Sequence, residues 1–119
     1  MTSMPTFSDL GLTPTLLAAV TAVGYEAPTP IQARTIPALL AGRDVIGQAQ
    51  TGTGKTAAFG IPIVEKIDPS SNHVQALILT PTRELCVQVT EEIARIGQFR
   101  GVRLVAIYGG SSMERAVPC

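Results

Sequence analysis

The stretch DVIGQAQTGTGKTAAFGIPIVEKI, residues 44–67, joins a short apolar run to a helical pattern through a glycine-rich loop. Asp44 to Gln48 is typical of a buried strand, and the residues after Gly54 keep helical spacing to about Ile67. Between them, AQTGTGKT (Ala49 to Thr56) has the spacing of a phosphate-binding loop between a strand and a helix. This stretch predicts an α/β fold with an anion site at the end of a strand.

The residue types of this loop suit a polyphosphate. Gly52 and Gly54 allow the backbone to turn its N–H groups inward, and the positive end of the following helix attracts an anion. We expect Lys55 to contact the β and γ phosphates and the Thr56 hydroxyl to bind Mg²⁺. Ala49 stands where the general pattern has its first glycine, so this position must have ordinary backbone angles. The alternative is a glycine-rich turn with a solvated lysine, and the loop alone identifies neither the nucleotide nor the reaction.

Strand-like and helix-like segments alternate beyond the loop. Ala76 to Thr80 and Arg103 to Tyr108 are predicted strands, with a helix from Arg83 to Ile96 between them. Two more helices, Thr13 to Val23 and Pro30 to Leu40, precede the loop. The alternation predicts a parallel sheet with flanking helices.

The chain of 119 residues is expected to form part of one domain, with a helical prefix (1–43) and an α/β part (44–119). After the third strand we expect a crossover helix, capped by Ser111 or Ser112 and stopped within about two turns by Pro118. So short a crossover would leave a sheet edge uncovered, so the predicted domain is incomplete.

Composition limits the functional classes. Nine Lys plus Arg balance nine Asp plus Glu, so any nucleic-acid binding must come from local placement of charge. No apolar run approaches a membrane span, and the N-terminus lacks a basic leader, so we expect no membrane partner and a cytoplasmic protein. Cys86 and Cys119 form no metal or disulfide pattern and are interpreted as free thiols, Cys86 as a small core residue.

Four ordered motifs resemble those of the DEAD-box RNA helicases. GYEAPTPIQ (Gly24 to Gln32) is similar to their Q motif, and Phe7 lies upstream where the family has an aromatic residue. AQTGTGKT corresponds to motif I and TPTREL (Thr80 to Leu85) to motif Ia, while the pair Gly109 and Gly110 resembles the GG motif. The resemblance runs over nearly the whole chain.

The resemblance implies the N-terminal part of the first RecA-like domain of an ATP-dependent RNA helicase, with ATP and Mg²⁺ as cofactors and an RNA backbone as partner. Lys55 and Thr56 would be catalytic, with Thr56 as the metal ligand. The implied nucleotide-binding residues are Phe7, Tyr25, Gln32, Ala49, Gln50, Thr51, Gly52, Thr53, Gly54, Lys55 and Thr56. The implied RNA-binding residues are Pro81, Thr82, Arg83, Glu84, Gly109 and Gly110.

The chemistry of these side chains fits the implied roles but leaves alternatives open. The Gln32 amide can pair with adenine N6 and N7, and Phe7 can stack on the base. As alternatives, Gln32 binds local backbone at a helix start and Phe7 anchors the core. Thr82 and Arg83 begin a helix after a strand, which suits a backbone phosphate without base recognition; Glu84 caps or orients that turn.

The implied RNA-binding residues also have simpler interpretations. Thr82 can be an ordinary helix cap with Arg83 in solvent, and Gly109 and Gly110 can form an ordinary turn. Glu91, Glu92 and Arg95 are predicted to form the outer face of their helix, without a catalytic role.

ATP hydrolysis requires a second carboxylate cluster at a strand end, and Asp9, Asp44 and Asp68 do not provide one. In terms of the resemblance, the chain stops before the DEAD sequence, the SAT motif and the second RecA-like domain with its arginine finger. We therefore expect nucleotide binding without efficient hydrolysis or unwinding. The alternatives are a non-catalytic nucleotide-binding remnant or interaction fragment, or another enzyme such as a nucleotide kinase, although no arginine-rich lid is evident.

Overall fold

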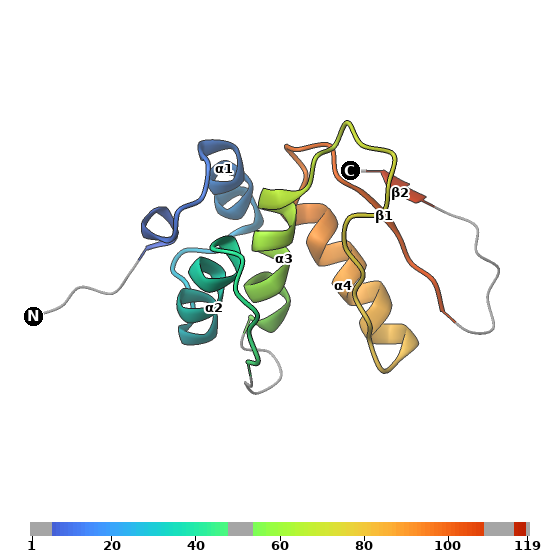
Figure 1. Cartoon of the computed structure of the whole chain (residues 1–119), viewed down its shortest axis with the longest axis horizontal. Helices are drawn as coiled ribbons and strands as arrows, with labels where there is room; N and C mark the ends of the chain where they lie inside the picture. The colour runs from blue at the N-terminus through green and yellow to red at the C-terminus, as the bar shows by residue number, and fades with distance from the viewer. Residues whose placement is uncertain (1–5, 48–53, 109–115, 119) are drawn as a thin grey trace, which may run out of the picture.

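The computed structural model describes residues 6–47, 54–108 and 116–118, which form a layer of helices with two short strands beside it (Figure 1). The described elements, in chain order, are the 3-10 helix η1 (Phe7–Leu10), the α-helices α1 (Pro14–Val23), α2 (Pro30–Leu40), α3 (Lys55–Lys66) and α4 (Arg83–Ile96), and the strands β1 (Arg103–Val105) and β2 (Ala116–Pro118).

The four predicted α-helices are confirmed, and local capping explains where they begin and end. The Thr29 side chain accepts from the Gln32 backbone N–H at the start of α2, and the Thr82 side chain accepts from that of Leu85 at the start of α4. Gly24 ends α1 in the left-handed region, with φ at 103°, where a residue without Cβ is favoured. These are neighbour interactions, so the sequence predicts them well.

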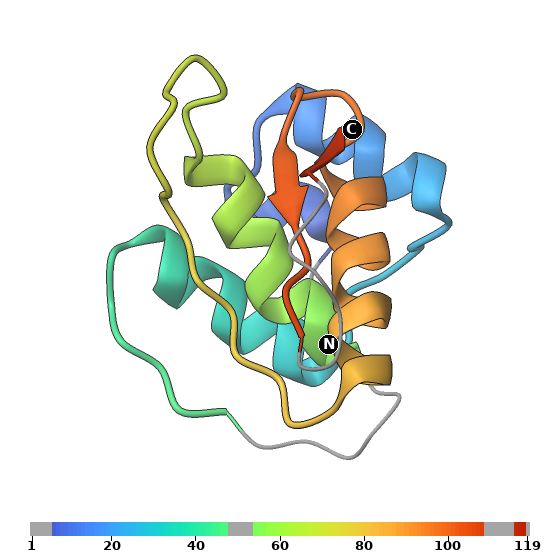
Figure 2. The ribbon, with the colours of Figure 1, turned by 90° about the vertical axis from the view of Figure 1, so that its right-hand side faces the viewer.

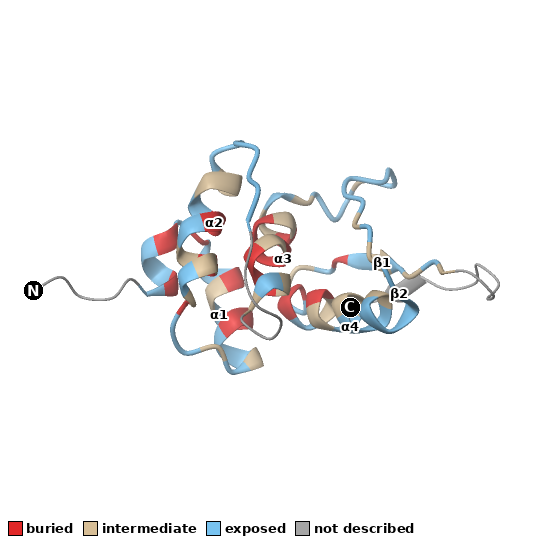
Figure 3. Ribbon diagram, turned by 90° about the horizontal axis from the view of Figure 1, so that it is seen from below, coloured by how far each residue is buried: buried red, intermediate tan, exposed pale blue. Residues whose placement is uncertain are grey.

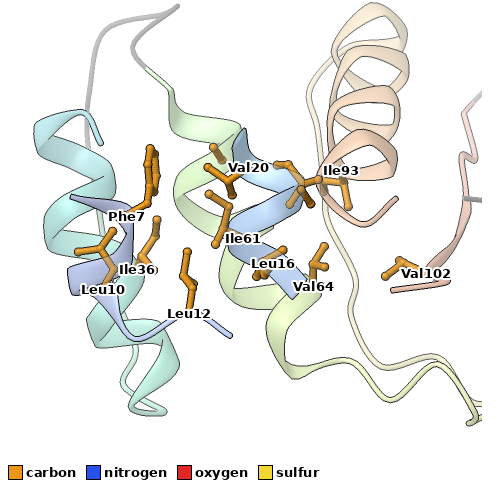
Figure 4. Close-up of a cluster of buried hydrophobic side chains, with 13 residues drawn as sticks. Phe7, Leu10, Leu12, Leu16, Val20, Ile36, Ile61, Val64, Ile93 and Val102 are labelled. Atoms are coloured by element: carbon orange, nitrogen blue, oxygen red, sulfur yellow. The ribbon is translucent and has the colours of Figure 1, made fainter. Parts of the chain in front are cut away.

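Helix α3 lies at the centre of the layer and packs against α2 on one side and α4 on the other (Figures 1 and 2). Ile61 of α3 is fully buried among side chains from the neighbouring helices, including Ile36, Val20 and Ile93 (Figure 4). At Gly60 a Cβ would lie 3.2 Å from Ile93 Cγ1, so the glycine lets α3 and α4 approach closely. Apolar burial across these helices holds the site-bearing ends of α3 and α4 in place.

The predicted parallel sheet is not seen in the described residues. The paired strands that they contain are β1 and β2, which run antiparallel with Leu104 opposite Val117. Of the predicted strand Asp44 to Gln48 the structure describes residues 44–47, and neither these nor residues 76–80 belong to a strand. Ile46 is 97% exposed and Leu79 86%. Figure 2 shows these segments, green and yellow, running along the outside of the helices, and Figure 3 shows how much of the chain outside the helices is exposed. Their apolar runs identify strand-like segments, but a strand forms only when a neighbour supplies the ladder, and no such neighbour lies in the described ranges.

The predicted third strand is shorter than expected, because only Arg103–Val105 of residues 103–108 is paired. The prediction of a crossover helix that continues to Pro118 is wrong for residues 116–118, which form strand β2. The expected cap at Ser111 or Ser112 lies outside the described residues. The antiparallel pairing of Val105 with Ala116 joins segments whose connection includes residues outside the described ranges, and the sequence carried no local signal for that pairing.

Candidate nucleotide-binding site

An open hollow of about 480 Å³ lies between the turn after α1 and the starts of α2 and α3. The turn supplies Tyr25, the start of α2 supplies Gln32, and the residue before α3 supplies Gly54. All three belong to the predicted nucleotide-binding set. The complete lining is Gly24, Tyr25, Glu26, Ala27, Thr29, Gln32 and Gly54.

The Gln32 side chain connects two walls of this hollow. Its Oε1 accepts from the Thr29 backbone N–H at 2.9 Å, and its Nε2 donates to the Gly54 carbonyl oxygen at 3.2 Å. Gln32 is 2% exposed. Its bond to the Thr29 backbone is the local contact at a helix start that the sequence left open as an alternative to adenine binding. The amide oxygen has a second lone pair and the amide nitrogen a second hydrogen, so the chemistry of base recognition is retained. Adenine pairing by Gln32 stays a prediction.

The start of α3 fits an anion. Gly54 precedes the helix with φ at 83°, and the first helical residue, Lys55, is exposed. The first amides of a helix have no acceptor within it, so they and the Lys55 ammonium suit phosphate oxygens. Thr56 follows, half-buried, with a hydroxyl suited to Mg²⁺. The remaining predicted loop residues, Ala49, Gln50, Thr51, Gly52 and Thr53, lie outside the described residues.

Phe7 lies behind Tyr25 and not at the surface of the hollow. It is 5% exposed in the core, and its ring stacks on Tyr25 with 6.2 Å between ring centroids and 29° between planes. This is the position of the core anchor considered above, and direct stacking on adenine stays a prediction.

The Tyr25 hydroxyl donates to Glu92 Oε2 on α4. Burial, followed by this hydrogen bond, raises the pKa of Tyr25 well above its usual value, so the hydroxyl remains a donor.

A second hollow, of about 310 Å³, lies where α4 begins beside the segment after β1. It brings together Pro81, Thr82 and Arg83 of the predicted RNA-binding set. The Arg83 guanidinium carbon lies 5.4 Å from the centroid of the Tyr108 ring, within the range of a cation–π interaction. Glu84 lies exposed in the first turn of α4 without lining the hollow. Gly109 and Gly110 lie outside the described residues.

Two site residues were missed or misassigned from the sequence. Glu92 was predicted on an outer helix face, but it is half-buried and binds Tyr25. Cys86 is not a core residue: it is half-buried, lines the second hollow, and its Sγ lies 3.9 Å from the Ile107 carbonyl oxygen. Cys86 lies three residues after Arg83, and this helical spacing indicates that both lie on the same face of α4. The pairing of Glu92 with Tyr25 spans 67 residues, so no local pattern in the sequence indicates it.

The part of the chain that the structure describes contains no group of three or more His, Cys, Asp or Glu that could hold a metal ion. None of its helices has the length and apolar character needed to cross a membrane.

Comparison with known proteins defines the class. Residues 29–117 match the family profile described as DEAD/DEAH box helicase. The DEAD-box ATP-dependent RNA helicase CshA of Geobacillus kaustophilus is 56% identical over 114 residues, and that of Bacillus subtilis is 54% identical over 112. These alignments cover 96% and 94% of this chain but 24% and 23% of the relatives. The chain belongs to the DEAD/DEAH box helicase family, as its motifs predicted, and spans about a quarter of the length of these curated relatives.

Solved structures agree with this assignment. A DEAD box protein from the hyperthermophile Methanococcus jannaschii matches with a TM-score of 0.85 at 41% identity, over 90% of this chain and 30% of the other. The RNA helicase Prp28 from Chaetomium thermophilum, bound to ADP, matches with a TM-score of 0.81 at 43% identity, over 92% and 28%. Dbp5 from S. cerevisiae, bound to RNA and ADP BeF3, matches with a TM-score of 0.78 at 36% identity, over 88% and 29%.

Proposed function

We propose that this chain is the adenine-nucleotide-binding and RNA-contacting part of an ATP-dependent RNA helicase. The observation that carries the proposal is the Gln32 Nε2 to Gly54 carbonyl hydrogen bond of 3.2 Å, which joins the hollow at Tyr25 to the start of α3. A nucleotide with its base in the hollow would direct its phosphates to the helix start. Two structural relatives, one bound to ADP and the other to RNA and ADP BeF3, support the same ligands.

The residues at the start of α3 fit Mg²⁺-ATP. Lys55 would contact the phosphates, and Thr56 would hold Mg²⁺, which offsets phosphate charge. The start of α3 contributes the Lys55 ammonium and the Thr56 hydroxyl, and the described residues contain no carboxylate cluster that could hold a metal ion. We therefore assign to this chain the binding of ATP, and assign hydrolysis and strand separation to the longer protein that its relatives exemplify.

The second hollow is the proposed RNA site. Thr82 caps α4, and Arg83 lies at its first position, so the amides and the guanidinium can hold one backbone phosphate. Such contacts do not distinguish bases, so we expect binding independent of sequence. A cytoplasmic location belongs to this proposal, since RNA is the proposed partner.

The direct test compares Lys55→Ala with Lys66→Ala. Both remove one lysine from α3, but Lys55 lies at its start and Lys66 in its last turn. ATP affinity, measured by calorimetric titration with Mg²⁺, should fall about tenfold or more for Lys55→Ala because a charged contact to phosphate is lost. It should be unchanged for Lys66→Ala. Equal affinities for the two variants would refute the phosphate site.

A further inference from the structure

Tyr25 is held at three points in the turn between α1 and α2. Its backbone N–H donates to the Val20 carbonyl oxygen at 3.2 Å, and its ring stacks on Phe7. Its hydroxyl donates to Glu92 on α4, 67 residues further along the chain. The first contact fixes the backbone of the turn, whereas the other two fix the orientation of the ring that lines the hollow.

Glu92 is the contact that comes from α4, much further along the chain than the other two. It is half-buried and precedes Ile93, a core residue that is 2% exposed, so α4 packing fixes its backbone. A partly buried hydroxyl needs an acceptor, and a carboxylate is a strong one. Glu92 does not line the hollow itself. Any effect that it has on a ligand there must therefore pass through the Tyr25 ring.

We propose that Glu92 is a positioning residue for the adenine part of a bound nucleotide: by holding the Tyr25 hydroxyl, it keeps the ring oriented as a wall of the hollow. This inference rests on the proposed nucleotide binding. A ring held before the ligand arrives costs less conformational entropy on binding than one that must be ordered. Without Glu92 only the stacking on Phe7 orients the ring, and the hydroxyl can turn to solvent, so base contact weakens.

The inference makes a selective prediction, because Tyr25 lies at the base end of the site and Lys55 at the phosphate end. Losing Glu92 should weaken binding of ATP but not of inorganic tripolyphosphate, which carries the phosphates without a base. A general loosening of the fold would weaken both ligands together. The ratio of the two affinities therefore separates positioning from a merely structural role.

The experiment titrates ATP and tripolyphosphate into the full chain and three variants. Glu92→Ala should bind ATP about three- to tenfold more weakly, in line with loss of one hydrogen bond, and tripolyphosphate as the parent does. Glu92→Gln, whose amide oxygen can still accept from Tyr25, should restore ATP binding. Glu91→Ala is the matched control, since this exposed neighbour carries the same charge on the same helix.

Tyr25→Phe provides a second arm, which removes the same hydrogen bond without changing a residue of α4. It should lose as much ATP affinity as Glu92→Ala, and the double variant should lose no more than either alone. If Glu92→Ala fails to show the parent's helical circular dichroism, Tyr25→Phe decides the question. Unchanged ATP affinity, or equal losses for ATP and tripolyphosphate, would overturn the inference while leaving the proposed function intact. A parent chain that binds no ATP would instead overturn the proposed function, and this inference with it.

Discussion

Gly54 is the residue at which backbone conformation and side-chain packing meet in the proposed nucleotide site. Its φ of 83° disfavours any residue with a Cβ, and an added Cβ would lie 2.3 Å from Gln32 Nε2. Two separate constraints therefore favour glycine at position 54. Glycine is needed both for the turn into α3 and for the approach of Gln32.

Gly42 offers a matched control for this residue, because its φ is 84° but nothing lies within 4 Å of its added Cβ. Both alanine substitutions should lower the free energy of unfolding through backbone strain. Gly54→Ala should cost about 1–3 kcal/mol more, since Gln32 must move. Urea unfolding of the two variants measures the difference. Equal losses would show that Gln32 does not pack against Gly54.

The raised pKa of Tyr25 predicts a pH dependence of stability. The folded state holds the hydroxyl proton more tightly than the unfolded chain, whose tyrosine has its usual pKa of 10.0. This contribution is fully present below about pH 10 and is lost as the pH rises further. Unfolding free energies of the parent should therefore fall more steeply above about pH 10 than those of Tyr25→Phe. Parallel curves would contradict the buried contact with Glu92.

At the scale of elements, the four α-helices could be predicted from the sequence, whereas of the three predicted strands only part of Arg103 to Tyr108 is a strand in the described residues. Thr29 and Thr82 cap the starts of α2 and α4, and Gly24 ends α1, through contacts within a few residues, so the bounds at Pro30, Arg83 and Val23 were predicted correctly. Val45, Ile46 and Leu79 have the composition of buried strands, yet a strand depends on a neighbour that composition does not specify. The same limit applies to Glu92, whose partner is distant in sequence.

The packing of α3 can be tested against the exposed extended segment. Ile61 on α3 is fully buried, whereas Ile46 is 97% exposed. Ile61→Ala should lower the free energy of unfolding by about 2–5 kcal/mol, because it removes buried methyl groups and leaves a cavity. Ile46→Ala should change it by less than about 0.5 kcal/mol, as for other surface substitutions. A large loss for Ile46→Ala would mean that residues 44–47 pair in solution as the predicted strand.

The start of α4 is the element that carries the RNA proposal. Arg83→Ala should weaken binding of single-stranded RNA and reduce the slope of log affinity against log salt by about one, because one phosphate contact is lost. Fluorescence anisotropy with two unrelated RNA sequences should show the same loss for both. Arg34→Ala, on the exposed side of α2, is the control. A loss confined to one sequence would contradict backbone recognition.

At the scale of the whole molecule, one helical layer carries both hollows. The base end of the proposed nucleotide site depends on Tyr25 and Gln32, its phosphate end on α3, and the proposed RNA site on the start of α4. Helix α4 contacts both sites, through Glu92 and through Arg83. The sequence motifs contain several residues that line the two hollows, among them Gln32 and Arg83, but the contacts between those residues and the rest of the chain required the fold.

The most direct measurement of the central claim is calorimetric unfolding of the full chain with ATP or GTP in the presence of Mg²⁺. The chain has no tryptophan, so heat capacity is a suitable signal. A ligand that binds only the folded state must raise the transition temperature. We predict one cooperative transition that ATP raises more than GTP does, with Gln32→Ala narrowing the difference. A transition that neither nucleotide moves, or that both move equally, would contradict an adenine site built on Gln32 and the start of α3.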